Sequence, residues 1–202
     1  MGLSSKGVKV KIGMGEKVTA KPQINRTCEV KIGVKGYLSA TVIRKDGSKE
    51  VVADRVPNLI TNAGFEFISD KVYENTDDKA TEQACHVGLS QNTTLDLTTS
   101  AARSATSMPG ELTANGLGRQ SITGASGQVN EYSRSGNVSK HTLKTIFAAT
   151  GGTNNNIGRS AIFSSATSGG TMVHIADFTS PFNLGGGDSV EVTWEITLAE
   201  SA

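Results

Sequence analysis

Aromatic side chains are scarce in this 202-residue sequence, at 5% of residues, and charged residues, at 19%, fall below the usual quarter. Two cysteines, Cys28 and Cys85, allow at most one bridge, which excludes a scaffold held together by several disulfides. Because both lie in apolar, strand-like surroundings, we expect them to be buried free thiols in a reducing cytoplasm.

Long apolar runs are absent as well. No stretch reaches the roughly 18 residues of a membrane span, and no apolar stretch follows the first charges as it does in a secretory signal. The formal net charge is +1, and the basic residues are scattered apart from a mildly basic start that includes Lys9 and Lys11. Nucleic-acid binding normally needs a concentrated basic face, so we expect neither a membrane nor a nucleic acid as a partner.

Glycine, with 23 residues, is abundant together with serine, threonine and asparagine, a composition typical of short strands joined by tight turns. The clearest strand is the last, because apolar and polar residues alternate without error over 188–198. This period of two predicts a half-buried antiparallel strand. Val192, Trp194 and Ile196 share its inward face, and burial of the tryptophan contributes on the order of 2–3 kcal/mol, so we expect these three residues to anchor the core.

A hairpin and a helix are also predicted. Asp46-Gly47 lies between the β-prone runs 37–44 and 49–53, and glycine accepts the positive φ that a tight hairpin turn requires. Apolar residues at helical spacing in 57–72 predict a helix of about ten residues, whose start Thr61 or Asn62 can cap.

Further strands are expected at 8–12, 28–34, 84–90, 117–123, 138–149, 157–165 and 171–179. The total of roughly nine to eleven strands and one helix favours an all-β, mainly antiparallel fold of the β-sandwich or jelly-roll type with long loops. We expect residues 36–202 to form this sandwich domain and residues 1–35 to be an N-terminal arm or extra strands.

Residues 91–116 form a long polar excursion around Met108-Pro109-Gly110. Loops of this length are usually functional or become ordered against a partner. We therefore expect partner contacts in this loop and in the N-terminal arm. The candidates are Lys9, Lys11, Leu95, Leu97, Met108 and Leu112.

Residues that could carry chemistry do not form a recognisable constellation. His86, His141 and His174 each lie in an expected strand, and none has the spacing of a metal-ligand pair. Glu191 and Glu195 lie on one strand face about 13–14 Å apart, which is too far for a glycosidase pair. We expect no catalytic, cofactor-binding or metal-binding residue and hence no enzyme, although catalytic groups can also come together from distant strands.

Several short motifs resemble, in their order along the chain, small virion proteins of tailed bacteriophages. They are Gly36-Tyr37 with Ile43-Arg44-Lys45-Asp46-Gly47, Pro57-Asn58-Leu59-Ile60-Thr61-Asn62-Ala63-Gly64, His86-Val87-Gly88-Leu89-Ser90 with Thr98-Thr99, Ile157-Gly158-Arg159-Ser160-Ala161-Ile162-Phe163, Gly170-Thr171-Met172-Val173-His174-Ile175-Ala176-Asp177-Phe178 and the strand 190–198. The resemblance covers most of residues 36–198. It departs where the family has Glu-Ala-Gly and this chain has Arg159-Ser160-Ala161.

The resemblance implies a non-enzymatic structural subunit, made in the bacterial host cytoplasm and located in the virion. An exterior capsid decoration or cement protein is the first reading, and a tail-fibre, collar or tail-adaptor protein, with or without receptor or carbohydrate binding, is the second. Apart from the resemblance, a hydrolase that acts on a polymer is a third reading. The implied partners are major capsid or tail proteins and further copies of the chain.

Overall fold

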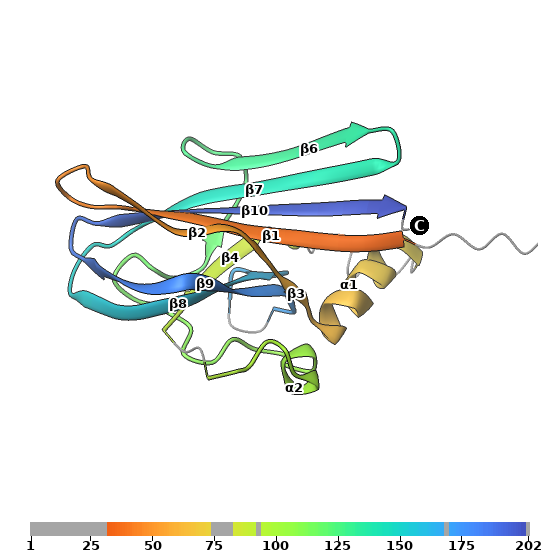
Figure 1. Cartoon of the computed structure of the whole chain (residues 1–202), viewed down its shortest axis with the longest axis horizontal. Coiled ribbons are helices and arrows are strands. Elements are labelled where there is room, and N and C mark those ends of the chain that lie inside the picture. Colours follow the sequence, from red (N-terminus) through yellow and green to blue (C-terminus); the bar gives the residue numbers. More distant parts are fainter. Residues whose placement is uncertain (1–31, 74–82, 92–93, 168–169, 201–202) are drawn as a thin grey trace, which may run out of the picture.

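The computed structural model describes residues 32–73, 83–91, 94–167 and 170–200, which form ten strands and two helices (Figure 1). The strands are β1 (Ile32–Ile43), β2 (Lys49–Pro57), β3 (Leu59–Ile60), β4 (His86–Ser90), β5 (Gln120–Ser121), β6 (Val129–Ser135), β7 (Val138–Ala148), β8 (Thr153–Phe163), β9 (Met172–Gly185) and β10 (Ser189–Glu200). The helices are α1 (Asn62–Tyr73) and α2 (Ser100–Arg103). None of these helices is long and apolar enough to cross a bilayer.

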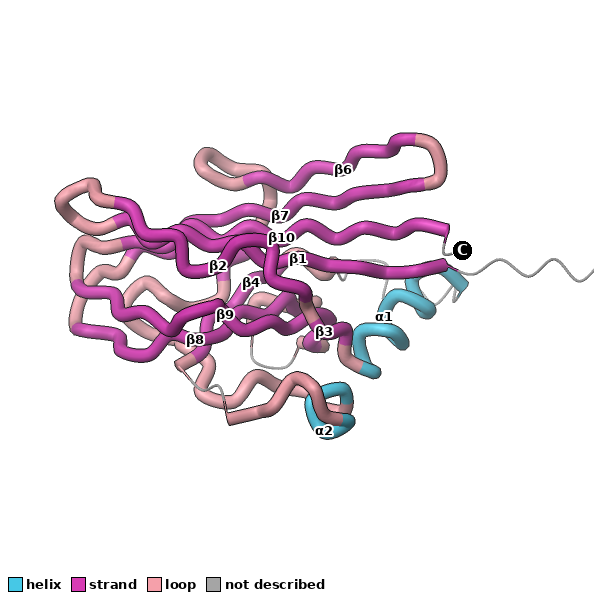
Figure 2. Tube along the Cα trace, viewed as in Figure 1, coloured by secondary structure: helices cyan, strands magenta, loops and turns pink. Residues whose placement is uncertain are grey.

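The strands form two five-stranded sheets that stack on each other (Figures 1 and 2). Sheet A has the order β2-β1-β10-β7-β6, and sheet B has the order β3-β9-β8-β4-β5. Every strand pair is antiparallel. The predicted all-β sandwich is therefore confirmed.

The centre of sheet A is the pair β1–β10, which stays in register from Ile32 opposite Glu200 to Ile43 opposite Ser189. The side chains of Leu38, Val42, Val192 and Trp194 are fully buried between the sheets, and Ile196 is nearly so. The predicted inward face of the last strand thus lies in the core. β1 also crosses the expected domain boundary at residues 35 and 36, so this boundary falls inside a strand.

The β1–β2 hairpin has the predicted turn. Gly47 adopts φ +85°, and its backbone N–H donates to the carbonyl of Arg44 at 2.8 Å. The Asp46 carboxylate accepts from both the backbone N–H and the hydroxyl of Ser48, and these hydrogen bonds lower the pKa of the Asp46 carboxyl group.

The predicted helix is confirmed as α1, which begins at Asn62, directly after the predicted capping residue Thr61. The backbone N–H of Thr61 donates to the carbonyl of Val173, and the Thr61 hydroxyl accepts from the backbone N–H of Gly64 at 2.9 Å. Residues 58–60 instead continue from sheet A into sheet B, where Leu59 and Ile60 pair with β9. Thr61 thus caps the helix and fixes its first turn on sheet B.

The described residues of the long excursion over 91–116 pack against this molecule's own sheet B. Met108, 3% exposed, joins Ala161, Phe163, Met172 and Ile175 in a second apolar cluster on the outer face of sheet B. Within the excursion, Thr99 caps the short helix α2, and Ser90 bridges to Glu111. Figure 1 shows this segment below sheet B, on the side away from sheet A.

The sequence analysis did not predict strand β6. Most residues of its sequence, Val-Asn-Glu-Tyr-Ser-Arg-Ser, are polar, so the alternation of apolar and polar residues that marks a half-buried strand is absent. β6 nevertheless pairs with β7 over seven residues, from Val129 opposite Lys144 to Ser135 opposite Val138. The two strands are joined by Gly136-Asn137, with Gly136 at φ +57°. A glycine at the first central position of a two-residue loop is the signature of a type II′ turn, and this dipeptide was the available signal.

Candidate interaction site at the open end of the sandwich

An apolar groove of about 650 Å³ opens at one end of the sandwich. There, helix α1 as well as sheet B faces the inner side of sheet A. Val34, Leu143, Ile196 and Leu198 contribute from sheet A, and α1 contributes Phe67 and Ile68. Figure 1 shows α1 lying beneath the ends of β1 and β10, at the side where the C-terminal end is marked. We call this cavity the open-end groove.

Close packing between α1 and β9 sets one wall of the groove. A Cβ atom at Gly64 would lie 2.3 Å from the carbonyl oxygen of Val173, a distance at which atoms overlap. The Thr61 hydroxyl additionally donates to the carbonyl of Met172. The glycine and the threonine therefore bring the helix against β9 and place Phe67 in the groove.

His174 lies at the groove's inner wall and is 3% exposed. Its burial lowers the pKa of the imidazole from 6.5 to about 4, so the side chain is neutral at pH 7. The amide nitrogen of Asn58 lies within hydrogen-bond distance of Nδ1. Because an amide N–H donates, Nδ1 accepts and the proton resides on Nε2. His174 is thus a structural histidine, with its ring 6.4 Å from that of Trp194.

The polar side of the groove comes from β6 and β7. His141 Nε2 lies 2.6 Å from Asn130 Oδ1, and Asn130 Nδ2 donates to the carbonyl of Ile122 at 2.9 Å. Since the amide oxygen accepts, His141 donates through Nε2. Partial burial lowers the pKa of His141, which favours the neutral ring. This chain of hydrogen bonds ties β6 to the segment that follows β5.

Cys85 also lines the groove. Its thiol is free and buried, as predicted for this cysteine, and burial raises the pKa of the thiol. Cys28 lies outside the described residues. Among the residues that the structure describes, no three His, Cys, Asp or Glu side chains come close enough to hold a metal ion.

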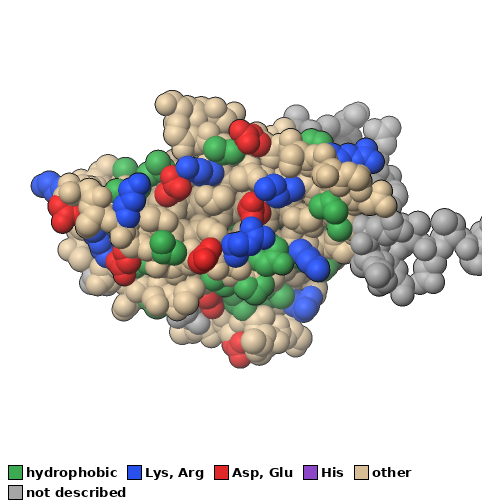
Figure 3. Space-filling model, turned by 45° about the horizontal axis from the view of Figure 1, so that its top comes forward, with side chains coloured by type: hydrophobic (Ala, Val, Ile, Leu, Met, Phe, Trp, Pro, Cys, Tyr) green, Lys and Arg blue, Asp and Glu red, His purple; other side chains and the backbone are tan. Residues whose placement is uncertain are grey.

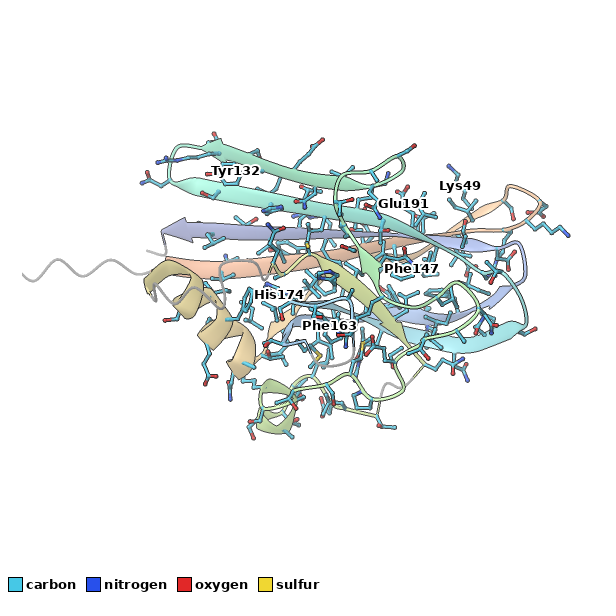
Figure 4. The ribbon with its side chains drawn as sticks, turned by 180° about the vertical axis from the view of Figure 1, so that it is seen from behind. Lys49, Tyr132, Phe147, Phe163, His174 and Glu191 are labelled. Atoms are coloured by element: carbon cyan, nitrogen blue, oxygen red, sulfur yellow. The ribbon has the colours of Figure 1, made fainter. Side chains whose placement is uncertain are left out.

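Beside the groove, β6 forms one edge of sheet A and projects past sheet B (Figure 2). Within the described part of the chain it pairs with β7 alone. Tyr132, in its middle, is 64% exposed. Figure 4 shows Tyr132 on the β6–β7 hairpin, apart from Phe147 and His174, which lie between the sheets. The edge therefore exposes both backbone and an aromatic ring.

The outer face of sheet A carries paired charges. Glu195 accepts from Arg55 and from Lys140, and these two partners lower the pKa of its carboxyl group. Lys144 lies 2.7 Å from Glu191. Figure 3 shows basic and acidic side chains interspersed over this side of the molecule, with small apolar patches between them. On this face the described charged side chains are mixed in sign and form no concentrated basic region.

Two arginines attach the 91–116 excursion and the segment after it to sheet B. Arg159, whose side chain is 0% exposed, binds Asp177 with two nitrogens and donates to the carbonyl of Leu95 at 2.6 Å. Arg119 pairs with Glu111, and its guanidinium carbon lies 3.5 Å from the centre of the Phe163 ring. Sequence reasoning treated the Arg159 motif as a departure from a family pattern and missed this role.

The structure separates the predicted partner contacts into three groups. Met108 is buried within this chain, so it offers no surface to a partner. Leu95, Leu97 and Leu112 are partly buried and pack on the two apolar clusters, Leu95 and Leu97 on the outer one and Leu112 on the central one. Lys9 and Lys11 lie outside the described residues. The open-end groove and β6 are the exposed features that the sequence did not indicate.

Comparison with protein-family models, with curated proteins and with solved structures finds no match to this chain. Its function is therefore argued from its own residues.

Proposed function

We propose that this protein is a non-enzymatic structural subunit of a tailed-bacteriophage particle, and that it acts as an exterior capsid decoration or cement protein. In this role it binds other virion proteins, such as the major capsid protein, and further copies of itself. The protein is then located in the virion.

The observation that carries the proposal is the exposed edge of sheet A. β6 presents seven residues in regular register, and the open-end groove lies directly beside it, since Asn130 of β6 also lines the groove. Exposed regular edges are a liability on an isolated protein, and a subunit that is covered by neighbours can retain them. Binding through an edge and an adjoining apolar surface is the mode expected of a particle component.

The order of the short motifs along the chain supports a role in a phage particle. Each motif that resembles phage virion proteins corresponds to a structural element: β1 with its hairpin turn, β3 with the start of α1, then β4, β8, β9 and β10. The motifs thus describe much of sheet B and the central strand of sheet A. The β6–β7 hairpin lies outside these motifs.

The test is to locate the protein in purified virions of the phage that encodes it. Electron microscopy at subnanometre resolution should show density of this size at regular positions on the capsid exterior, and light scattering should detect a complex with isolated capsid protein. The proposal fails if the protein is absent from virions, or if the purified chain stays a monomer that binds neither capsid nor tail proteins.

A receptor-binding role in a tail fibre, collar or adaptor is the second candidate, and the exposed ring of Tyr132 favours it. An aromatic ring beside polar groups, here Asn130 and His141, provides both an apolar face and hydrogen-bonding partners. Glycan-array binding that Tyr132→Ala abolishes, together with a tail location in virions, would select this role over capsid decoration.

A further inference from the structure

The geometry of β6 points to a specific partner: a second copy of this chain, joined through β6 of both copies around a two-fold axis at Tyr132. The two sheets A then form one continuous ten-stranded sheet. This inference names the self-association surface of the proposed structural subunit and rests on that proposal for its biological role, whereas the contact itself is argued from β6 alone.

The turn fixes which backbone groups of β6 are available. Ser135 and Val138 flank the two-residue loop Gly136-Asn137 and therefore exchange hydrogen bonds with each other. Hydrogen-bonded pairs alternate along an antiparallel ladder, so Ser133 and Glu131 also direct their N–H and C=O groups toward β7. Asn130, Tyr132 and Arg134 consequently direct theirs outward, toward the open edge.

A two-fold axis at Tyr132 uses all of these outward groups at once. Tyr132 then faces Tyr132 of the second copy, and Asn130 and Arg134 face each other twice. Three facing pairs that each exchange two bonds give about six backbone hydrogen bonds. A shift of the axis to Glu131 or Ser133 leaves two such pairs, or about four bonds. The register at Tyr132 is therefore favoured.

The side chains are compatible with this register. On one face Tyr132 meets its own copy, and aromatic pairs across strands are stabilising. On the same face Arg134 lies opposite the neutral Asn130, and on the other face Glu131 lies opposite the neutral Ser133. No two like charges stand directly opposite each other, so the strand is complementary to itself.

The opposite edge of sheet A shows what a protected edge looks like in this protein. β2 contains two register shifts against β1 and has Arg55 at φ +49°. It begins with Lys49 and ends with Pro57. Bulges, lysine and proline are the devices that prevent edge pairing. β6 has none of the three: its register against β7 is unbroken, and its sequence lacks lysine and proline.

A cysteine cross-link tests the register directly. In a Cys28→Ser background, which removes one of the two native thiols while Cys85 stays buried, Tyr132→Cys places two cysteines in a facing hydrogen-bonded pair. The expected Cα–Cα distance of about 5.5 Å suits a disulfide. Mild oxidation should convert most of the protein to a covalent dimer on a non-reducing gel.

The matched control is Ser135→Cys on the same strand. In the inferred register the two copies of residue 135 lie six positions apart, or about 20 Å, so this variant should stay monomeric on the gel. Equal cross-linking of both variants, or cross-linking of Ser135→Cys alone, would overturn the inference.

A charge exchange tests the contact without oxidation. Tyr132→Lys places like charges opposite each other and should raise the dissociation constant of the dimer at least about tenfold, as should Tyr132→Glu. A mixture of the two variants should recover dimer by light scattering, because lysine then faces glutamate. Val51→Lys, at a similarly exposed position on β2, should leave the dimer intact.

Three outcomes separate this inference from the proposed function. A wild-type dimer that the Tyr132 substitutions weaken and the mixture restores supports the contact. A wild-type dimer that they leave unchanged, or a wild-type monomer at high micromolar concentration, overturns the contact. If the Tyr132→Lys chain still binds virions in either of these cases, the proposed structural role stands without it.

Discussion

The indole Nε1–H of Trp194 donates to the hydroxyl oxygen of Ser160 at 3.3 Å, across the interface between the two sheets. Ser160 in turn donates to the carbonyl of Gly88 at 3.1 Å. Both side chains are fully buried. The hydroxyl thus connects β10 of sheet A with β8 and β4 of sheet B, and it supplies the acceptor that a buried tryptophan requires.

Replacement of Ser160 by alanine should destabilise the protein by about 1–3 kcal/mol, because the buried indole N–H loses its acceptor. Urea denaturation followed by tryptophan fluorescence measures the effect, since Trp194 is the single tryptophan. Ser180→Ala, at an exposed position on β9, is the matched control and should change stability by less than about 0.5 kcal/mol. Equal stability of the two variants would show that the hydrogen bond contributes nothing.

Acid should destabilise the fold through His174. The pKa of this side chain is lowered from 6.5 to about 4 in the folded state, so the unfolded chain binds the proton more readily. The stabilisation is complete above about pH 6.5 and is lost as the pH falls toward 4, by on the order of 3 kcal/mol. Denaturant titrations at several pH values should show this slope.

Glutamine at position 174 retains an acceptor for Asn58 and does not titrate. His174→Gln should therefore flatten the pH dependence of stability between pH 6.5 and 4. His141→Gln serves as the comparison, since His141 is less buried and should account for a smaller part of the slope. An unchanged slope in His174→Gln would rule out His174 as the source.

Gly64→Ala should destabilise the protein, although alanine is the better helix former at most helical positions. The new methyl group would lie 2.3 Å from the Val173 carbonyl oxygen, so α1 must move away from β9. Overpacking of this kind costs about 1–3 kcal/mol. Thermal unfolding measures the loss. Ser69→Ala, on the exposed side of the same helix, should be neutral or slightly stabilising, and similar behaviour of Gly64→Ala would contradict the close contact.

The Arg159–Asp177 pair should behave as a unit. Asp177→Ala leaves a buried guanidinium without its carboxylate and should cost about 3 kcal/mol. Arg159→Met removes the whole guanidinium group, whose Nη1 atom has no acceptor among the described residues. This variant should therefore lose less stability than Asp177→Ala. The double variant should be more stable than Asp177→Ala alone. A double-mutant cycle by urea denaturation gives the coupling, and strict additivity would contradict it.

Limited proteolysis can locate the effect of this pair within the chain. Because Arg159 also donates to the carbonyl of Leu95, loss of the arginine should expose the segment that follows residue 94 to protease before the sandwich unfolds. Cleavage that begins instead in the β6–β7 hairpin would mean that the arginine does not hold this loop.

The elements that the sequence predicted well are those whose pattern follows from burial. The alternation over 188–198 reflects a strand with one face in the core, and Asp46-Gly47 marks a turn that needs positive φ. The start of α1 was predicted correctly from Thr61 as a capping residue, whereas Leu59, which shares the helical spacing, lies with Ile60 in β3. In the fold these residues pair with β9, so sheet formation outweighs the local helical pattern.

The candidate site was harder to predict, because its residues are brought together, or left exposed, only by the tertiary structure. The β6 strand has no apolar face, since one side is solvent and the other extends past sheet B. The apolar residues of the 91–116 excursion were predicted to contact a partner, whereas Leu95, Leu97, Met108 and Leu112 pack on apolar clusters of this chain. Apolar composition alone cannot distinguish a partner's surface from the outer face of the chain's own sheet. The open-end groove combines residues from eight segments between 34 and 198, and no local pattern reports such a cavity.

The passage of the chain from β2 into β3 has a consequence for how this protein can aggregate. The same segment forms the border strand of sheet A and then of sheet B, and the bulges and the crossing to sheet B shorten the regular edge that β2 offers. Lateral growth of sheet A is therefore limited to one side. A molecule that can extend its sheet on one side forms a finite pair, whereas two usable sides would permit an endless fibril.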